Sequence, residues 1–318
     1  MSLNIYILTY NRSSYLRHSI ESVLNQTYKD FQLFILDNCS QDNTSEVVHS
    51  FCDTRLHYIR HDTNIGGYGN FNFAIDHCKA DYFVLFHDDD RMLPHFIEKE
   101  ISVMESDERI AAVSGNAIYM GKPNLDGFKT LNPCGGIYSG NDVCKNFLGK
   151  GRILMFPSLM YRTAFIKANN IHFKAEVGPC GDVVFYCDIG TYGGVIYELS
   201  DVIMQRRIHA MQDSQRDKYG MNLQLLDYFK HTRKYRRLFL ENRYDIYARF
   251  VKVMVLDFLS QRMSRGQLLL LRSEFRKILR IKGRCIWDIA LLFTFKHPGV
   301  MLVVYRVYCK LYRKPVNL

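Results

Sequence analysis

The sequence predicts an α/β fold with a doubly wound, mostly parallel, Rossmann-like sheet and a basic helical section at its carboxyl end. Short apolar runs alternate with helix-like segments through the first 115 residues. Such alternation is typical of parallel strands that are joined by helices on both faces of a sheet. From about residue 222 onward the pattern is instead helical and strongly basic.

The expected strands are short apolar runs, and the segments between them carry apolar residues at helical spacing. We expect strands at residues 3–8, 32–36, 56–60, 82–86, 110–114 and 155–161. We expect helices at residues 14–26, 44–51 and 70–78 and from Pro94, since proline is favoured in the first turn of a helix. Residues 121–152 are rich in Gly, Asn and Pro and predict irregular loops.

Charge divides the chain near residue 205. Residues 1–204 hold 17 Lys plus Arg and 24 Asp plus Glu, a net charge of −7, whereas residues 205–318 hold 25 and 8, a net charge of +17. A basic section of this kind attracts phosphate, in nucleic acid or in anionic lipid.

The nine cysteines and the absence of targeting segments predict a cytoplasmic protein. The cysteines are scattered and never spaced as C-x-x-C, which is typical of reduced thiols rather than of a zinc site. We expect no signal peptide, and the most apolar long segment, residues 286–305, is interrupted by charged residues and a proline.

Polar residues follow each of the first four expected strands. In an open parallel sheet, ligands bind beyond the carboxyl ends of the strands, so these residues should converge on one edge. The candidates are Thr9, Tyr10, Asn11 and Arg12 after the first strand, Asp37 and Asn38 after the second, Asn64, Gly66 and Gly67 after the third, and His87, Asp88, Asp89 and Asp90 after the fourth.

The acidic triplet Asp88–Asp90 predicts a divalent metal site. Like charges this close repel, and a hard cation such as Mg²⁺ or Mn²⁺ removes the conflict. We expect an exposed, extended triplet in which Asp88 and Asp90 face one ion while Asp89 points elsewhere. A solvated acidic turn that caps the helix at Pro94 is the alternative, and the position at a strand end favours the metal.

The other clusters allow two interpretations each. Asp37 and Asn38 suit hydrogen bonds to a nucleobase, or an Asx turn after a strand. Gly66 and Gly67 suit a loop that cradles phosphates, or simply a loose loop.

Several segments together resemble the family 2 glycosyltransferases, which have the GT-A fold. The segments are "IYILTYNRSSYLRHSIESVLNQTYKDFQLFILDNCSQDNT", "NIGGYGNFNFAI", "YFVLFHDDDRMLP", "FPSLMYRTAFIKANNIHF", "GDVVFY" and "RRIHAMQDS". The resemblance covers residues 3–215. It implies an enzyme that uses a nucleotide sugar and inverts the anomeric centre, with a donor-binding half at 1–115, an acceptor-side half at 116–215 and a basic section at 216–318.

The resemblance implies a role for each matching residue. Thr9, Asp37 and Asn38 would hold the nucleobase and ribose, the triplet would bind Mn²⁺ or Mg²⁺, Asp182 would be the catalytic base, and His209 would approach the diphosphate or the metal. The chain departs from the common pattern at Asn38 and at His87, where aspartates are usual, and at Gly181, where Glu is usual. The Gln-x-x-Arg-Trp motif of processive synthases is absent, which predicts an enzyme that adds one sugar per encounter.

Two other functions remain possible from the residues alone. A sugar-nucleotide pyrophosphorylase would need a glycine-rich loop after the first strand, where this chain has "TYNRSSY". A nucleic-acid-binding protein would use the basic section, but no recognised motif supports it.

The basic section also suggests a membrane surface. Its apolar residues are interleaved with Lys and Arg, at 268–282 and beyond Pro298, as in interfacial helices. A helical subdomain that packs on the catalytic domain is the alternative. Family members of this type commonly build bacterial surface polysaccharides, such as O-antigen or capsule, on lipid-linked acceptors. The resemblance therefore implies peripheral attachment to the inner face of the cell membrane.

Overall fold

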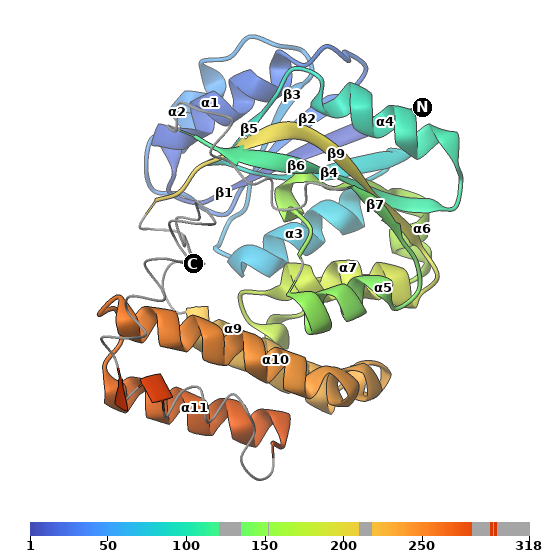
Figure 1. Cartoon of the computed structure of the whole chain (residues 1–318). Coiled ribbons are helices and arrows are strands. Elements are labelled where there is room, and N and C mark those ends of the chain that lie inside the picture. Colours follow the sequence, from blue (N-terminus) through green and yellow to red (C-terminus); the bar gives the residue numbers. More distant parts are fainter. Residues whose placement is uncertain (121–134, 152, 210–217, 282–292, 295, 298–318) are drawn as a thin grey trace. The chain divides into compact units, whose positions relative to one another are not determined.

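The computed structural model describes residues 1–120, 135–151, 153–209, 218–281, 293–294 and 296–297. The chain divides into two compact units, one of residues 1–144 and 152–216 and the other of residues 145–151 and 217–318 (Figure 1). The functional limits expected at 115 and 215 stay predictions.

The first unit is built on one mixed sheet in the order β3-β2-β1-β4-β8-β6-β9-β5, with β7 paired to β9. Strands β1 to β4 are parallel and form one side of it, and β8 runs antiparallel between β4 and β6. The strands are β1 (Leu3–Thr9), β2 (Gln32–Asp37), β3 (Leu56–Arg60), β4 (Tyr82–His87), β5 (Arg91–Met92), β6 (Ile110–Tyr119), β7 (Gly136–Tyr138), β8 (Met160–Arg162) and β9 (Val195–Arg206).

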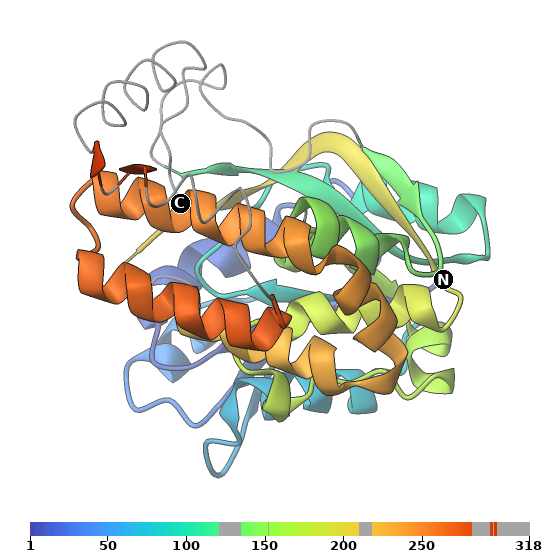
Figure 2. The same cartoon turned by 60° about the horizontal axis from the view of Figure 1, so that its bottom comes forward.

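Helices cover both faces of the sheet, as a doubly wound fold requires (Figures 1 and 2). One face carries α1 (Ser13–Leu24), α2 (Thr44–His49) and α4 (Phe96–Ser106), and the other carries α3 (Gly66–His77), α6 (Thr163–Ala168) and α7 (Gly181–Thr191). Leu16 and Phe96 pack with Val84 and Phe86 in the apolar core of the first face. Phe83, which alternates with them, stacks on Tyr161 at 5.1 Å between ring centroids.

The expected elements of the first half are present, and most of their limits lie within two residues of the expected ones. Two limits differ by more. β6 continues to Tyr119, and α3 begins at Gly66 rather than at residue 70. The expected strand 155–161 is wrong in part, because Phe156–Ser158 form a 3-10 turn and the strand is only Met160–Arg162.

The expectation of irregular loops at 121–152 is also wrong in part. Residues 121–134 and 152 lie outside the described part of the chain, but β7, α5 (Asp142–Lys145) and a π-helix (Asn146–Lys150) lie in the remainder. Val143, Cys144, Phe147 and Leu148 recur at helical spacing and are buried, which explains the helical structure despite the glycines.

The second unit is helical. Its helices are α9 (Lys218–His231), α10 (Arg233–Leu259) and α11 (Arg265–Leu279), and α10 and α11 lie side by side in Figures 1 and 2. Ser264 and Gln267 form a capping box at the start of α11. Among the described residues, no helix combines the length and the apolar character that crossing a bilayer requires. The expected basic stretch beyond Pro298 lies outside the described residues.

Candidate active site

The polar residues that follow β1, β2 and β4 converge on one edge of the sheet. Thr9 pairs with Asp37 in the β1–β2 ladder, and Leu8 pairs with His87 in the β1–β4 ladder. The convergence follows from the parallel order of these strands.

The loop after β1 is held by the loop after β2. Asn11 has a left-handed backbone with φ of 52°, its N–H donates to the Ser40 hydroxyl at 2.9 Å, and its side-chain oxygen accepts from the Gln41 N–H at 2.7 Å. Tyr10 is left exposed in this loop. Arg12 turns toward the acidic triplet.

Asp37 is buried, and both of its carboxylate oxygens are engaged within the protein. One oxygen accepts from the Tyr58 hydroxyl at 2.6 Å, and the other accepts from the Ser40 N–H at 2.8 Å. The second bond is the turn-forming contact of the alternative interpretation. Nucleobase binding by Asp37 stays a prediction.

Asn38 links the ends of β2 and β3. Its side-chain N–H donates to Asn64 Oδ1 at 2.9 Å, and its oxygen accepts from the Ile65 N–H at 2.8 Å. Asn64 Oδ1 also accepts from the N–H of Gly66, whose φ of +77° suits glycine. A Cβ at Gly66 or Gly67 would meet open space, so a ligand has room there, and phosphate binding stays a prediction.

The acidic triplet is buried, which corrects the expectation of an exposed cluster. Asp88, Asp89 and Asp90 are 2%, 4% and 2% exposed. The strand ends at His87 and a turn follows, so side chains do not alternate as in an extended segment. Asp89, rather than Asp88, therefore joins Asp90.

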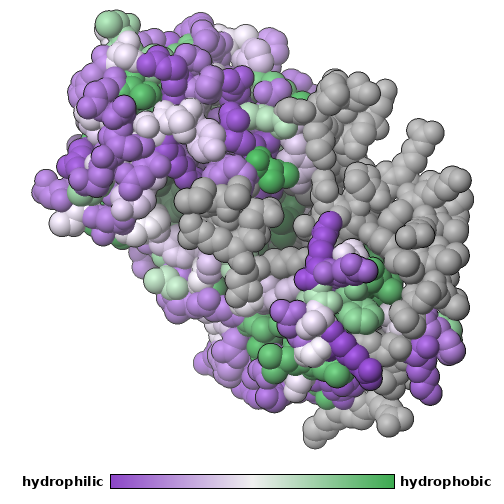
Figure 3. All heavy atoms as spheres, turned by 90° about the vertical axis from the view of Figure 1, so that its left-hand side faces the viewer, coloured by the Kyte–Doolittle hydropathy of each residue, from purple (hydrophilic) through white to green (hydrophobic). Residues whose placement is uncertain are grey.

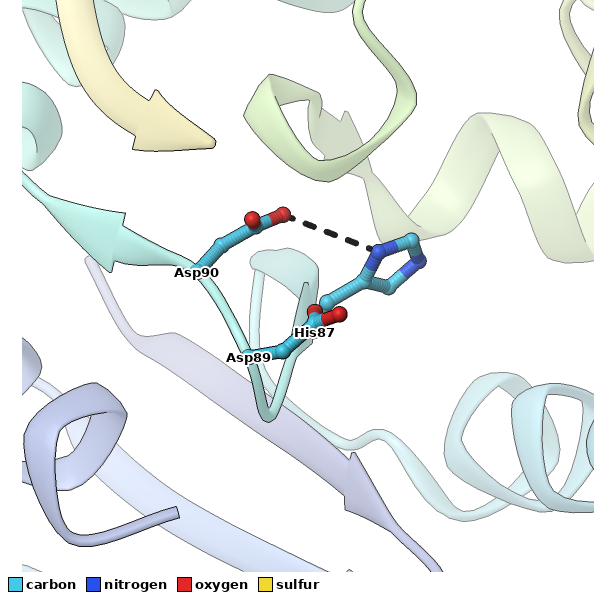
Figure 4. A group of neighbouring side chains, drawn as sticks. All are labelled: His87, Asp89 and Asp90. Carbon is cyan, nitrogen blue, oxygen red and sulfur yellow. Dashed lines mark ion pairs between the residues drawn. The ribbon is translucent and has the colours of Figure 1, made fainter. Parts of the chain in front are cut away.

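One ligand atom each from His87, Asp89 and Asp90 lies within 4.8 Å of the others. Figure 4 shows the imidazole of His87 and the carboxylate of Asp90 pointing toward one another, and their Nδ1 and Oδ2 are 3.7 Å apart. Asp88 instead accepts from Arg12 Nη1 at 3.1 Å, and Asp89 Oδ2 is 3.8 Å from the same nitrogen.

Burial governs the protonation of this cluster. It raises the pKa of Asp88 to about 6, against the opposing charge of Arg12. It also raises the pKa of Asp90, with a further rise from the charge of Asp89. Burial lowers the pKa of His87 to about 4, so its ring is neutral at pH 7. Neutral imidazole and carboxylate oxygens are ligands that Mn²⁺ accepts, and a bound cation would relieve the repulsion.

The segment after β9 returns to the same cluster. His209 Nε2 lies 2.8 Å from Asp89 Oδ2, and the N–H of Arg207 donates to Asp90 Oδ1 at 2.9 Å. Tyr15 of α1 packs against both residues. Its ring is 5.0 Å from that of His209, and the Arg207 guanidinium lies 4.9 Å from the centroid of the Tyr15 ring. Tyr15 carries no signal in the sequence beyond its place in the first helical turn after the first polar cluster.

Asp182 lies in the first turn of α7 and is half-buried. Burial raises its pKa to about 6, opposed by the Val183 N–H and the charge of Arg206. The charge of Arg206 also lowers the pKa of Asp90. The charge of Arg206, at the end of β9, therefore acts on both Asp182 and the triplet. The sequence alone did not point to Arg206.

The chain matches the family model described as glycosyl transferase family 2 over residues 4–170. It is 29% identical over 106 residues to the UDP-Glc:alpha-D-GlcNAc-diphosphoundecaprenol beta-1,3-glucosyltransferase WfaP of Escherichia coli, an alignment that covers 33% of this chain and 42% of that protein. The chain spans about a third to two thirds of the length of the first curated relatives it matches.

Two solved structures share the fold. S. aureus TarS, residues 1–349, superposes with a TM-score of 0.62 at 16% identity, over 88% of this chain and 81% of that one. The mannosyltransferase PcManGT of Pyrobaculum calidifontis, in complex with GDP-Man and Mn²⁺, superposes with a TM-score of 0.53 at 14% identity, over 92% and 86%. The sheet and its flanking helices are those of the GT-A fold. The family model spans more than half of the residues, and the chain therefore belongs to glycosyl transferase family 2.

Proposed function

We propose that this protein transfers a single sugar from a nucleoside-diphosphate donor to a hydroxyl of a glycan or lipid-linked acceptor, with inversion. One observation carries the proposal: Asp89, which follows β4, and His209, which follows β9, meet beside Asp90 and Arg12 at the carboxyl edge of the sheet. Family membership supplies the reaction class.

The donor would lie along this edge. Thr9, Tyr10, Asn11 and the Asn38–Asn64 pair would border the nucleoside, and Gly66 and Gly67 would leave space beside the phosphates. Arg12, next to Asp88 and Asp89, would place a positive charge near the diphosphate. A fixed guanidinium suits phosphate oxygens because its donors form a rigid fork.

Mn²⁺ or Mg²⁺ would be held by Asp89 and Asp90 with His209, and His87 is the fourth candidate ligand. Asp88 is bound to Arg12 and would act beside the metal rather than as its main ligand. When bound, the metal neutralises negative charge that develops on the leaving diphosphate. The solved structure of PcManGT, of the same fold, is a complex with GDP-Man and Mn²⁺.

Asp182 would act as the base. The acceptor oxygen forms a bond to the anomeric carbon as the bond from that carbon to the diphosphate oxygen breaks, and the acceptor proton passes to Asp182. Attack from the face opposite the leaving group inverts the centre. A carboxyl with a pKa near 6 is ionised at neutral pH and is basic enough to take the proton.

The acceptor is proposed from the relatives. WfaP and the Campylobacter jejuni enzyme GalNAc(5)-diNAcBac-PP-undecaprenol beta-1,3-glucosyltransferase are named for lipid-linked acceptors. A similar acceptor would place this protein in surface polysaccharide synthesis, at a step that adds one sugar.

The helical unit would bring the enzyme to the inner face of the membrane. Residues 218–281 hold 15 Lys plus Arg against 5 Asp plus Glu. Leu269 and Leu270 of α11 are 40% and 65% exposed. In the lower part of Figure 3, hydrophobic and hydrophilic residues lie next to one another on the surface of the helical unit. Each basic residue near an anionic surface contributes about 1 kcal/mol.

A donor screen tests the proposal. UDP-glucose, UDP-GlcNAc and GDP-mannose are incubated with the protein and Mn²⁺ or Mg²⁺, and release of the nucleoside diphosphate is measured. We expect slow hydrolysis of one donor, abolished by chelator. No hydrolysis and no thermal shift with any of the three donors would contradict it.

A further inference from the structure

Asp182 depends on a turn that α7 does not stabilise by itself. The first N–H groups of a helix lack partners within the helix, and a side chain usually caps them. The residue before α7, Cys180, makes no side-chain cap. Gly178, at φ +75°, begins the turn that leads to Gly181 and Asp182.

Tyr68 of α3 forms hydrogen bonds at both ends of this turn. Its hydroxyl donates to the carbonyl oxygen of Gly178 and accepts from the N–H of Gly181 at 2.7 Å. The two bonds hold the two ends of the turn at one atom.

Gly181 is shaped for this contact. A Cβ at position 181 would overlap the Tyr68 hydroxyl and would lie 2.6 Å from its Cζ. Any other residue would displace either the tyrosine or the turn. The glycine at this position, directly before Asp182, therefore has a partner on another element.

The tyrosine is itself fixed from two sides. Its ring stacks on Phe173 at 5.4 Å with an interplanar angle of 25°. Asn72, one turn further along α3, binds the backbone of Phe173 twice, at 3.0 Å and 2.9 Å. Two residues before Tyr68, α3 begins at the Asn38–Asn64 contact that links the ends of β2 and β3.

We propose that Tyr68 is the positioning residue for Asp182, and that it couples the loop on the donor side to the catalytic base. This inference rests on the proposed function. The hydroxyl holds the backbone at both ends of the turn. Its loss therefore allows the Asp182 carboxylate to move away from the position in which it accepts the proton of the acceptor hydroxyl. Donor binding, which uses Gly66 and Gly67 at the start of the same helix, remains, because Tyr68→Phe removes only the hydroxyl and leaves the backbone of α3 in place. A misplaced base costs rate rather than affinity.

The test compares Tyr68→Phe with wild type in steady-state transfer or hydrolysis, using whichever of UDP-glucose, UDP-GlcNAc and GDP-mannose the wild type turns over. We expect kcat to fall about 10-fold or more while the KM for the donor and the Kd for its nucleoside diphosphate with Mn²⁺ stay within about twofold. Tyr82→Phe is the matched control, because its hydroxyl lies at the start of β4, at the opposite edge of the sheet, and we expect wild-type kcat.

Gly181→Ala keeps the inference testable if Tyr68→Phe folds poorly, and we expect it to lower kcat in the same way. A Tyr68→Phe or Gly181→Ala enzyme with unchanged kcat overturns the inference, and so does a change confined to donor KM. A wild type that turns over none of the three donors contradicts the proposed function instead.

Discussion

His209 Nε2 lies 2.8 Å from Asp89 Oδ2, across 120 residues of sequence. This contact closes the candidate metal site from the β9 side. The Nδ1 of the same ring is buried and has no hydrogen-bond partner among the described residues.

Replacing His209 by Ala should lower Mn²⁺-dependent turnover at least 10-fold, because a ligand or a diphosphate contact is lost. The measurement is the rate of donor hydrolysis against Mn²⁺ concentration. His172→Ala is the control: its Nε2 lies 2.7 Å from Asp76, a pair of the same kind away from the site. Equal Mn²⁺ dependence in wild type and His209→Ala would count against the assignment.

Asp182→Asn should retain donor binding and lose turnover, because the base acts on the acceptor. In wild type, kcat should decline as pH falls through about 6, since burial raises the pKa of Asp182 to about 6 and its protonated form accepts no proton. The pH profile of kcat and UDP calorimetry check both parts. Collapse of donor affinity with surviving turnover would make Asp182 a donor ligand.

Glu100→Gln should stabilise the protein at pH 7.5 by about 1–3 kcal/mol and leave it unchanged near pH 4. Glu100 is fully buried in α4, neither carboxylate oxygen has a hydrogen-bond partner among the described residues, and burial raises its pKa well above the usual value. The unfolded chain ionises near pH 4.5 while the folded one stays protonated, so wild-type stability is lost as pH rises.

Urea unfolding of this variant at both pH values gives the free energies. Glu98→Gln is the control, because Glu98 is exposed two residues earlier in the same helix. A stabilisation that is equal at pH 4 and pH 7.5 would mean that ionisation of Glu100 is not its cause.

Replacing Leu269 and Leu270 by Ser should reduce co-sedimentation with vesicles that contain phosphatidylglycerol, because these exposed side chains would enter the interface. Wild-type binding should need the anionic lipid and weaken with salt. Tyr192→Ser removes an exposed aromatic residue from the first unit and should change nothing. Equal recovery of wild type in the supernatant with neutral and anionic vesicles would favour the packed subdomain.

The sequence predicts the first half of the fold well because β1, β2 and β4 are short apolar runs with most residues buried. Phe83, Val84, Leu85 and Phe86 are all fully buried, so the run needs no alternation to be recognised. β9 was not predicted: Glu198 and Asp201 interrupt its apolar pattern, and its pairing with β6 has register shifts.

The sequence predicts the site residues that directly follow a strand. It does not predict the contacts between segments that are distant in the chain. The position of Asp88–Asp90 followed from β4, but their burial did not, because His209 and Arg207 arrive from β9 to cover them. Tyr68 could have been suspected only as an aromatic residue between Gly67 and Gly69. Its partners are more than 100 residues away, beyond any local pattern.

The most direct test of the metal-dependent donor site is calorimetry of UDP binding in the presence and absence of Mn²⁺. The wild type should bind UDP at least 10-fold more tightly with Mn²⁺, and Asp89→Asn and Asp90→Asn should lose that gain while remaining folded. Asp76→Asn, which removes an exposed carboxylate beside a histidine, should keep it. UDP binding that is the same with and without Mn²⁺, or a full Mn²⁺ effect in Asp89→Asn, would contradict the account.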